Sequence, residues 1–267
     1  MKKCVYFLIL IIALASASCN GVSTTSAGSS GNADNFITKK WLNVSLLDST
    51  DDNSPKYETK FSIELFESDN KEREGKINSS ILYAIFGYDN LSAEAAMDSF
   101  LTNAYAEYAD LRPEYLNEKQ INENPAWFNF SHIVNTRVEY GYRDIINYII
   151  HNEYYNGGAH PNSAYTIINF DPNTGNEIKL NDVFKDNYEE FLNNRLIDAL
   201  AEKIGANSRK EIQEKGYLTF NDIFPTENFI MKEDSILFYY NMYEIAPRAA
   251  GTTILGFTYE DLSIILK

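Results

Sequence analysis

Both cysteines of this chain, Cys4 and Cys19, lie near its N-terminus, which limits how the rest can be stabilised. No disulfide framework can form after Cys19, so the fold must depend on the packing of apolar side chains. The 19 tyrosines and 16 phenylalanines supply large apolar surfaces for such a core. Thiol catalysis and cysteine-ligated zinc are excluded there for the same reason. We expect a globular protein without a bound metal or cofactor.

Residues 1–18 have the order of a lipoprotein signal peptide. Lys2 and Lys3 form a basic start, residues 5–15 are almost purely apolar, and small residues lie directly before Cys19. The apolar run is shorter than the roughly 20 residues that a bilayer-spanning helix needs. We therefore expect cleavage before Cys19 and lipidation of its thiol. The alternative is an ordinary secretory peptide in which the cysteine occurs by chance.

Residues 19–35 are small and polar and show no apolar periodicity, which predicts a flexible tether. A lipidated export signal places the protein in the cell envelope, with the N-terminal lipid as its contact with the membrane. Asn20 differs from the aspartate that often retains a lipoprotein in the inner membrane. The expected location is therefore the periplasmic face of the outer membrane.

The chain is strongly acidic, with a formal net charge of -15. Loss of Lys2 and Lys3 with the leader leaves 21 basic residues against 38 acidic ones, a net charge of -17. Such a surface repels nucleic acid and anionic lipid and attracts basic proteins. The alternative interpretation is that the acidity simply keeps an exported protein soluble.

Strands and helices are predicted in local clusters. Residues 128–140 alternate between apolar and polar positions, as in a strand with one buried face, and residues 144–154 are apolar at both parities, as in a central strand covered on two sides. Helical periodicity predicts helices over 76–86, from Ser92 to a stop at Pro113, and over 187–204. Further strands are expected at 41–48, 57–66, 165–170, 177–180, 229–232, 235–240 and 253–257.

This order favours an α+β fold, with helices packed on a mainly antiparallel sheet, over strict βαβ alternation. We expect two closely associated subdomains, an N-terminal α+β domain at 36–160 and a C-terminal α+β domain at 161–267. A β-hairpin with good turn chemistry, residues 171–175, lies near the start of the second.

Two segments, residues 154–162 and 239–247, are the candidate ligand-binding loops. Each combines tyrosines, amides and other polar groups with glycine or proline, a composition that suits a protein or sugar surface. The alternative is that the glycines serve the turn and the tyrosines cover the core. The candidate residues are Tyr155, Asn156, Gly157, Gly158, His160, Asn241, Tyr243, Glu244 and Pro247.

These loops also carry a family resemblance. The segments YYNGGAHPN, IINFDPNTGNEIKLNDVF and FYYNMYEIAPRAAG occur in the order seen in RsiV-type anti-sigma factors and in the region preceding some PdaC-type polysaccharide deacetylases. The chain from about Tyr155 onward resembles their paired extracytoplasmic domains, of which the C-terminal one is a domain of unknown function. Because RsiV-type proteins bind lysozyme through this region, the resemblance implies lysozyme binding here.

An enzymatic alternative stays open. His132 occupies an apolar position of its strand, where a packed histidine is expected, and His151 and His160 lack a metal-ligand spacing. Two carboxylates can suffice for glycoside cleavage, and Glu153, Asp171 and Glu244 are the acids nearest the two loops. We therefore expect a tethered, non-enzymatic module that binds a basic protein or a peptidoglycan-type glycan. The alternative is a cell-wall polysaccharide hydrolase or an accessory domain of one.

Overall fold

The structure is a computed structural model that describes residues 34–122 and 125–267. These described residues form one compact unit. The predicted signal peptide, the predicted lipidation site Cys19 and nearly all of the predicted tether lie outside the described residues. No helix in the described part of the chain is long and apolar enough to cross a bilayer.

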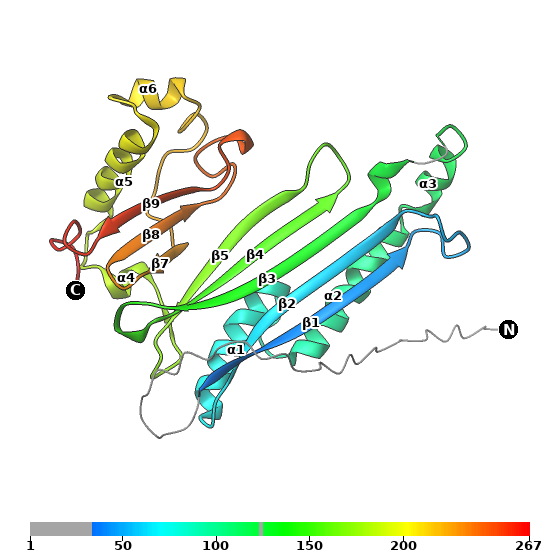
Figure 1. Cartoon of the computed structure of the whole chain (residues 1–267), viewed down its shortest axis with the longest axis horizontal. Helices are drawn as coiled ribbons and strands as arrows, with labels where there is room; N and C mark the ends of the chain where they lie inside the picture. Colours follow the sequence, from blue (N-terminus) through cyan, green and yellow to red (C-terminus); the bar gives the residue numbers. More distant parts are fainter. Residues whose placement is uncertain (1–33, 123–124) are drawn as a thin grey trace, which may run out of the picture. The chain divides into compact units, whose positions relative to one another are not determined.

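Six strands form the larger sheet, in the order β1-β2-β3-β4-β5-β6. Their bounds are β1 (Asn35–Leu46), β2 (Lys56–Glu67), β3 (Phe130–Tyr140), β4 (Ile146–Asn156), β5 (Asn162–Phe170) and β6 (Glu177–Ile178). Neighbouring strands are antiparallel except β2 and β3, which are parallel. A parallel pair needs a long crossover, and helices fill the connection between these two strands (Figure 1).

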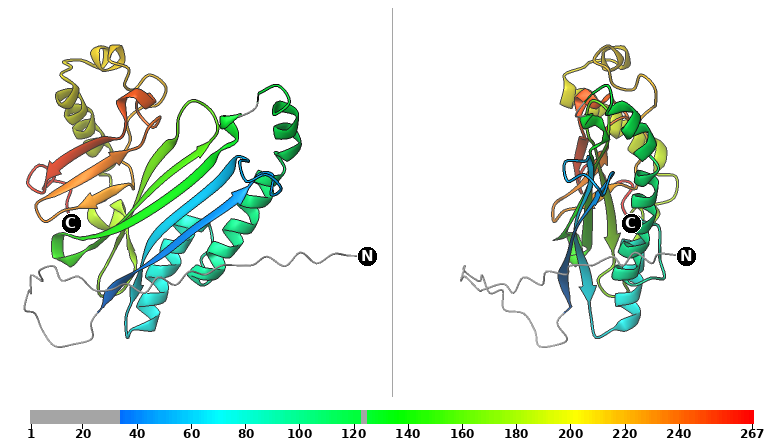
Figure 2. Two further views of the ribbon diagram at one scale, coloured as in Figure 1. Left: turned by 45° about the vertical axis from the view of Figure 1, so that its right-hand side comes forward. Right: turned by 90° about the vertical axis from the view of Figure 1, so that its right-hand side faces the viewer.

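Helices α1 (Lys71–Phe86), α2 (Ala93–Ala109) and α3 (Arg112–Glu118) form that crossover. They lie on one side of the larger sheet, as the right-hand view of Figure 2 shows. The buried cluster between sheet and helices includes Phe61, Ile63, Ile77, Ile81, Met97 and Tyr148. Apolar side chains that recur at every second strand residue thus meet apolar side chains at helical spacing, which excludes water from both.

The helix ends follow local chemistry. The Ser92 side chain accepts a hydrogen bond from the backbone N–H of Ala95, which confirms the predicted N-cap of α2. The Asn70 side chain caps α1 in the same way, so α1 begins earlier than the apolar pattern indicated, because its first turn is polar. Helix α2 ends at Ala109, and Pro113 lies in the first turn of α3, where its missing N–H costs nothing.

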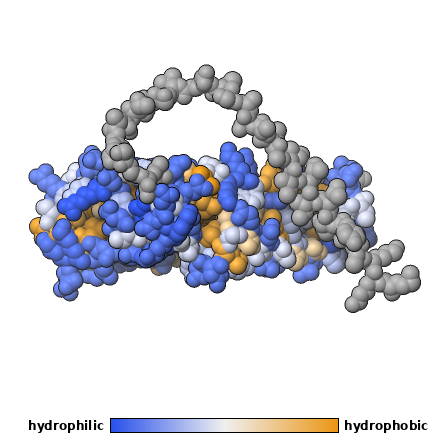
Figure 3. Space-filling view, turned by 90° about the horizontal axis from the view of Figure 1, so that it is seen from below, coloured by the Kyte–Doolittle hydropathy of each residue, from blue (hydrophilic) through white to orange (hydrophobic). Residues whose placement is uncertain are grey.

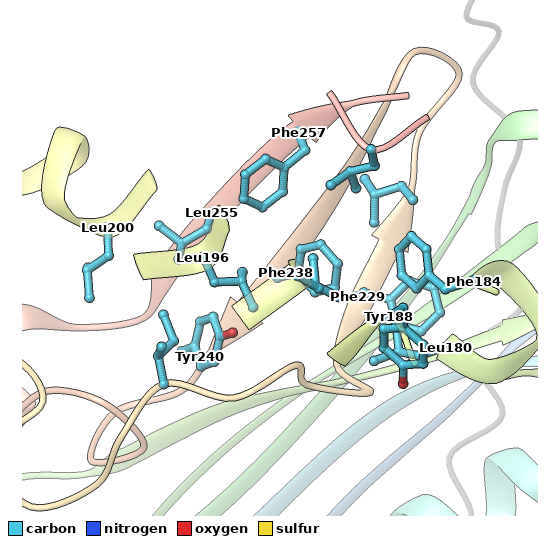
Figure 4. Packing of buried hydrophobic residues seen from close by; sticks show 14 of the residues in the cluster. Leu180, Phe184, Tyr188, Leu196, Leu200, Phe229, Phe238, Tyr240, Leu255 and Phe257 are labelled. Carbon is cyan, nitrogen blue, oxygen red and sulfur yellow. The ribbon is translucent and has the colours of Figure 1, made fainter. Parts of the chain in front are cut away.

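The smaller sheet has three antiparallel strands in the order β7-β8-β9. They are β7 (Phe229–Met231), β8 (Ser235–Tyr240) and β9 (Thr253–Thr258), with helices α4 (Leu180–Val183), α5 (Glu189–Ile204) and α6 (Arg209–Glu214) before them in the chain. One face packs on α5 in a core that includes Leu196, Leu200, Phe229, Phe238, Leu255 and Phe257 (Figure 4). Gly205 ends α5 in the left-handed conformation, as predicted.

The two sheets meet face to face. Ile149 and Ile167 of the larger sheet form a buried cluster with Ile230 and Tyr239 of the smaller one. The first half of β4 is therefore buried on both sides, by the helices and by the second sheet, which confirms the prediction of a central strand. A Cβ atom on Gly141 would lie 1.7 Å from the backbone oxygen of Met231, so β7 passes this residue too closely for any side chain.

The expected α+β class with a mainly antiparallel sheet is confirmed. The position 160/161, where we expected a change of subdomain, lies in the turn between β4 and β5, and both strands belong to the larger sheet. β1 begins before the predicted residue 41, because its pairing with β2 continues to the partners Asn35 and Glu67. The short helices α3, α4 and α6 were not predicted, and the strand expected at 177–180 is confined to Glu177–Ile178.

Candidate functional site

The first predicted loop is the tip of the β4–β5 hairpin. Gly157 and Gly158 both have positive φ, and a Cβ on Gly157 would lie 2.6 Å from the backbone oxygen of Trp127. The Tyr155 hydroxyl donates to the backbone oxygen of Gly158 at 2.7 Å, which holds the turn. Asn156 is the last residue of β4. These predicted residues shape the hairpin, and His160 lies exposed on it.

The second predicted loop connects β8 to β9. Asn241 forms two hydrogen bonds with Tyr165, accepting from its N–H at 2.7 Å and donating to its C=O at 2.9 Å. A carboxylate oxygen of Glu244 accepts from the N–H of Asn241 at 3.0 Å, which closes the turn. Tyr243 has a φ of 72° and is 60% exposed. Asn241 and Glu244 thus hold the loop against β5, while Tyr243 points to solvent.

The two loops are joined by a residue that was not predicted. Arg248 directly follows the predicted Pro247, in a 3₁₀ turn at Arg248–Ala250. Its Nη1 donates to the backbone oxygen of Pro161 at 2.8 Å. The structure therefore brings the two predicted segments together, through a guanidinium-to-carbonyl bond at their margins. The sequence carried no spacing signal that could pair residues so far apart in the chain.

A groove opens where the two sheets meet. A cavity of about 410 Å³ lies between β3 and β5 of the larger sheet and the β8–β9 region of the smaller one. Its walls include Arg137, Tyr165, Tyr239, Met242 and Ile254. A second hollow of about 150 Å³ shares Arg137 and Tyr165 with it, and we call the two together the inter-sheet groove. None of the nine candidate residues lines this groove, although Tyr239 and Met242 belong to the predicted segment 239–247.

Aromatic rings form one wall of the inter-sheet groove. The His151 ring stacks on Tyr165, with centroids 4.6 Å apart and planes inclined by 23°. Its Nε2 lies 2.7 Å from the Ser163 hydroxyl oxygen, which fixes the ring in place. The Tyr165 and Tyr239 rings are 6.0 Å apart and tilted by 59°. Such a rigid aromatic wall suits contact with a sugar ring or an apolar side chain.

Two cations and one carboxylate lie beside this wall. The Nε of Arg137 donates to Glu139 at 2.9 Å, and Lys232 forms an ion pair with the same carboxylate. Burial alone would raise the pKa of Glu139, but the hydrogen bonds from Lys232 and Arg137 outweigh it and hold that pKa below its usual range. Burial raises the pKa of Tyr239, and the positive charges of Arg137 and Lys232 oppose that shift. The cluster carries one more positive charge than negative.

Two of the candidate catalytic groups, His132 and Asp171, have structural partners. His132 packs against the Phe61 and Phe100 rings, and burial lowers its pKa, which confirms the expectation of a packed histidine. An oxygen of Asp171 accepts hydrogen bonds from two backbone amides of the β-turn at residues 171–175. Within residues 34–122 and 125–267, no group of histidine, cysteine, aspartate or glutamate residues is placed to hold a metal ion.

Residues 181–260 match the family model described as protein of unknown function DUF3298. This DUF3298 match covers α5, α6 and the smaller sheet, and therefore the wall of the groove that carries Tyr239, Met242 and Ile254. The opposite wall, with Arg137 and Tyr165, lies outside the matched residues. The expected similarity of the C-terminal part of the chain to a domain of unknown function is thus confirmed. The matched residues, 181–260, form a narrower range than the residues 155–267 of the expected resemblance.

Solved structures extend the DUF3298 similarity to most of the chain. A crystal structure of a DUF3298 family member from Bacteroides fragilis is 27% identical, with a TM-score of 0.80, and the match covers 88% of this chain and 94% of that one. A DUF3298 family protein from Pseudomonas aeruginosa is 17% identical, with a TM-score of 0.55, over 88% and 95% of the two chains. The second shares the fold alone. Among curated proteins, none matches this chain.

Proposed function

We propose that this chain is a non-enzymatic binding module of the cell envelope, anchored by a lipid on Cys19 at the periplasmic face of the outer membrane. The observation that carries the proposal is the inter-sheet groove, whose larger hollow measures about 410 Å³ and which has a fixed aromatic wall. Small-ligand sites are commonly concave and combine apolar walls with a few polar groups, and this groove has both.

Two of the three carboxylates expected near the loops, Asp171 and Glu244, and Glu139 at the groove support binding over catalysis. Asp171 and Glu244 each accept hydrogen bonds from backbone amides in turns, so their oxygens are engaged in holding local structure. Glu139, at the groove, is held by Arg137 and Lys232. A carboxyl group that acts as a general acid usually has a raised pKa, whereas that of Glu139 is lowered.

The partner follows from charge and from the family resemblance. A net charge of -15 attracts basic proteins and speeds their association. The resemblance to the lysozyme-binding region of RsiV-type proteins supports lysozyme as such a partner. The face seen in Figure 3 is largely hydrophilic, with its hydrophobic residues in separate patches, which fits attachment to the membrane through a lipid.

Binding of the purified chain to lysozyme and to isolated peptidoglycan, each at low and moderate salt, tests this function. We expect binding to at least one of them. The variant Ile254→Asp places a charge on the groove wall at a residue that is 36% exposed and should weaken binding on the order of tenfold or more, because apolar contact is lost. The matched control Ile264→Asp, at a residue 70% exposed and outside the groove, should bind normally.

Failure of both ligands at both salt concentrations would overturn the proposal. Release of soluble fragments from peptidoglycan would show that the chain is a hydrolase instead. The anchor is tested separately, by the mass of the mature N-terminal peptide from native membranes. An unprocessed leader or an unmodified Cys19 would contradict the lipid anchor and leave the binding test unaffected.

A further inference from the structure

The inter-sheet groove contains an arginine with unused hydrogen-bonding capacity. Arg137 uses its Nε to hold Glu139 at 2.9 Å, and its side chain is 51% exposed. Among the described residues, no hydrogen bond from its Nη1 or Nη2 atoms is present. A guanidinium offers paired N–H groups in one plane, a geometry that matches a carboxylate.

The electrostatic balance at this point favours an anion. Glu139 is the carboxylate that pairs with Arg137, and Lys232 pairs with the same group, so one negative charge faces two positive ones. The remaining titratable groups on the walls are His151, held by the Ser163 hydroxyl, and the hydroxyls of Tyr165 and Tyr239. In a chain with a net charge of -15, the groove is therefore a local site for a negatively charged group.

The other walls suit a small apolar group beside that anion. Met242 and Ile254 line the same cavity as Arg137, on the wall that also carries Tyr239, and Tyr165 lies on the wall of Arg137. The cavity, about 410 Å³, has the volume of a few residues of peptide and is near the lower end of the range for small-molecule sites. A ligand that carries a carboxylate and a small apolar side chain on the same carbon atom would match both the cationic and the apolar part of the groove.

We propose that the inter-sheet groove binds the free terminal carboxylate of a peptide, with the carboxylate on the Nη atoms of Arg137 and the last side chain against Met242, Ile254 and Tyr165. This inference rests on the proposed binding function and names its ligand chemistry. Such a terminus comes from two sources in the envelope, the C-terminal L-residue of a protein or the D-alanine end of a wall stem peptide.

The direct test is an NMR titration of the purified chain with four tripeptide probes. These are acetyl-Ala-D-Ala-D-Ala, its all-L counterpart and the C-terminal amide of each. We expect the carboxylate forms to bind at least tenfold more tightly than the amides, because a charge-assisted hydrogen bond is lost on amidation. Preference for the D-form identifies wall stem peptide as the source, and preference for the L-form identifies a protein terminus.

Two arginine variants assign the effect to the groove. Arg137→Gln removes the charge and should abolish the preference for carboxylate over amide. The matched control is Arg209→Gln, since Arg209 is also a half-exposed arginine, 50% exposed and paired with Asp222. It should behave like the parent. Thermal melting of each variant confirms that it is folded, and Ile254→Asp, which repels the anion from another element, should also weaken binding.

Equal binding of amide and carboxylate, a preference that survives in Arg137→Gln, or no saturation by any probe would each overturn the inference. The proposed function has a separate outcome, because it is judged by lysozyme and intact peptidoglycan. Binding of either of these, together with equal binding of the carboxylate and amide probes, would sustain the function and remove the carboxylate site. Failure of those ligands as well as the peptides would remove both.

Discussion

At the scale of single residues, asparagine side chains join the two sheets. Asn147 accepts from the N–H of Met231 at 2.8 Å and donates to its C=O at 3.1 Å. Asn169 donates to the backbone oxygen of Phe229 at 2.9 Å, and Asn228 accepts from the N–H of Ile167 at 2.8 Å. A side-chain amide has the same donor and acceptor as a peptide group, so it satisfies buried backbone groups where strands do not pair.

Replacing Asn147 should be costly. Its side chain is fully buried, and Asn147→Ala leaves the N–H and C=O of Met231 without these partners. We expect the free energy of unfolding to fall by about 2–4 kcal/mol, because each unsatisfied buried group costs about 1–3 kcal/mol. Urea denaturation measures the change. Asn173→Ala, at an exposed turn residue, should change stability by less than about 0.5 kcal/mol, and a similar loss in both variants would contradict this role for Asn147.

At the scale of elements, the close approach of β7 to the larger sheet depends on one residue without a side chain. Gly141 follows β3, and a Cβ there would meet the backbone oxygen of Met231 at 1.7 Å and the Asn147 amide nitrogen at 2.9 Å. Backbone cannot move aside as the end of a flexible side chain can. A larger residue must therefore push β7 away from the larger sheet and stretch the hydrogen bonds of Asn147.

Two glycine-to-alanine changes should consequently have opposite signs. Gly141→Ala should destabilise the protein by about 3 kcal/mol, as overpacking of a close contact does. Gly75→Ala should stabilise it by about 0.5–1 kcal/mol, because Gly75 lies inside α1 and a Cβ there meets nothing within 4 Å. Thermal melting of the two variants beside the parent provides the measurement. A melting temperature for Gly141→Ala at or above the parent's would refute the close approach.

At the scale of the whole molecule, an acidic chain uses several of its carboxylates in ion pairs and hydrogen bonds. For Glu139 and Glu177, burial acts to raise the pKa, but hydrogen bonds from Lys232 and Arg137 in one case, and from Lys179 and Ser80 in the other, lower it overall. Glu64 has the opposite shift, because burial raises its pKa without a cation to offset it. Carboxyl groups with a lowered pKa outnumber Glu64, since the pKa values of Glu74, Glu94 and Asp222 are also lowered.

Stability should therefore be lost in acid. A carboxyl group whose pKa is lower in the folded state stabilises the fold above its unfolded pKa, about 4.3 for glutamate, and loses that effect as pH falls through its folded pKa. We expect the free energy of unfolding to decline from about pH 4.5 downward. Glu139→Gln should make this decline shallower, as denaturant titrations between about pH 6 and 3 would measure. If the free energy of unfolding falls with pH as steeply in that variant as in the parent, the ion pairs of Glu139 with Arg137 and Lys232 do not stabilise the fold.

The sequence alone determined the features that depend on neighbouring residues. Alternation of apolar residues located β3, and apolar residues at both parities located the buried half of β4. Ser92 and Gly205 marked helix ends, and the spacing of apolar residues located α5. These are local effects, because the period of a strand or helix and the hydrogen bonds of a cap involve residues a few positions apart. The α+β class followed from the order of these elements.

Tertiary structure alone decided the groove and the contacts that form it. Arg137 and Tyr239 lie about a hundred positions apart in the chain, and only Tyr239 belongs to a segment that the sequence singled out, so no local pattern could bring them to one cavity. Tyr155, Gly157 and Gly158, which drew attention in the sequence, shape a turn, while Asn147 and Gly141, unremarkable in the sequence, set how closely β7 approaches the larger sheet. The physical reason is that the packing of one sheet on another is specified by side chains from distant segments, whose register appears only when the chain is folded.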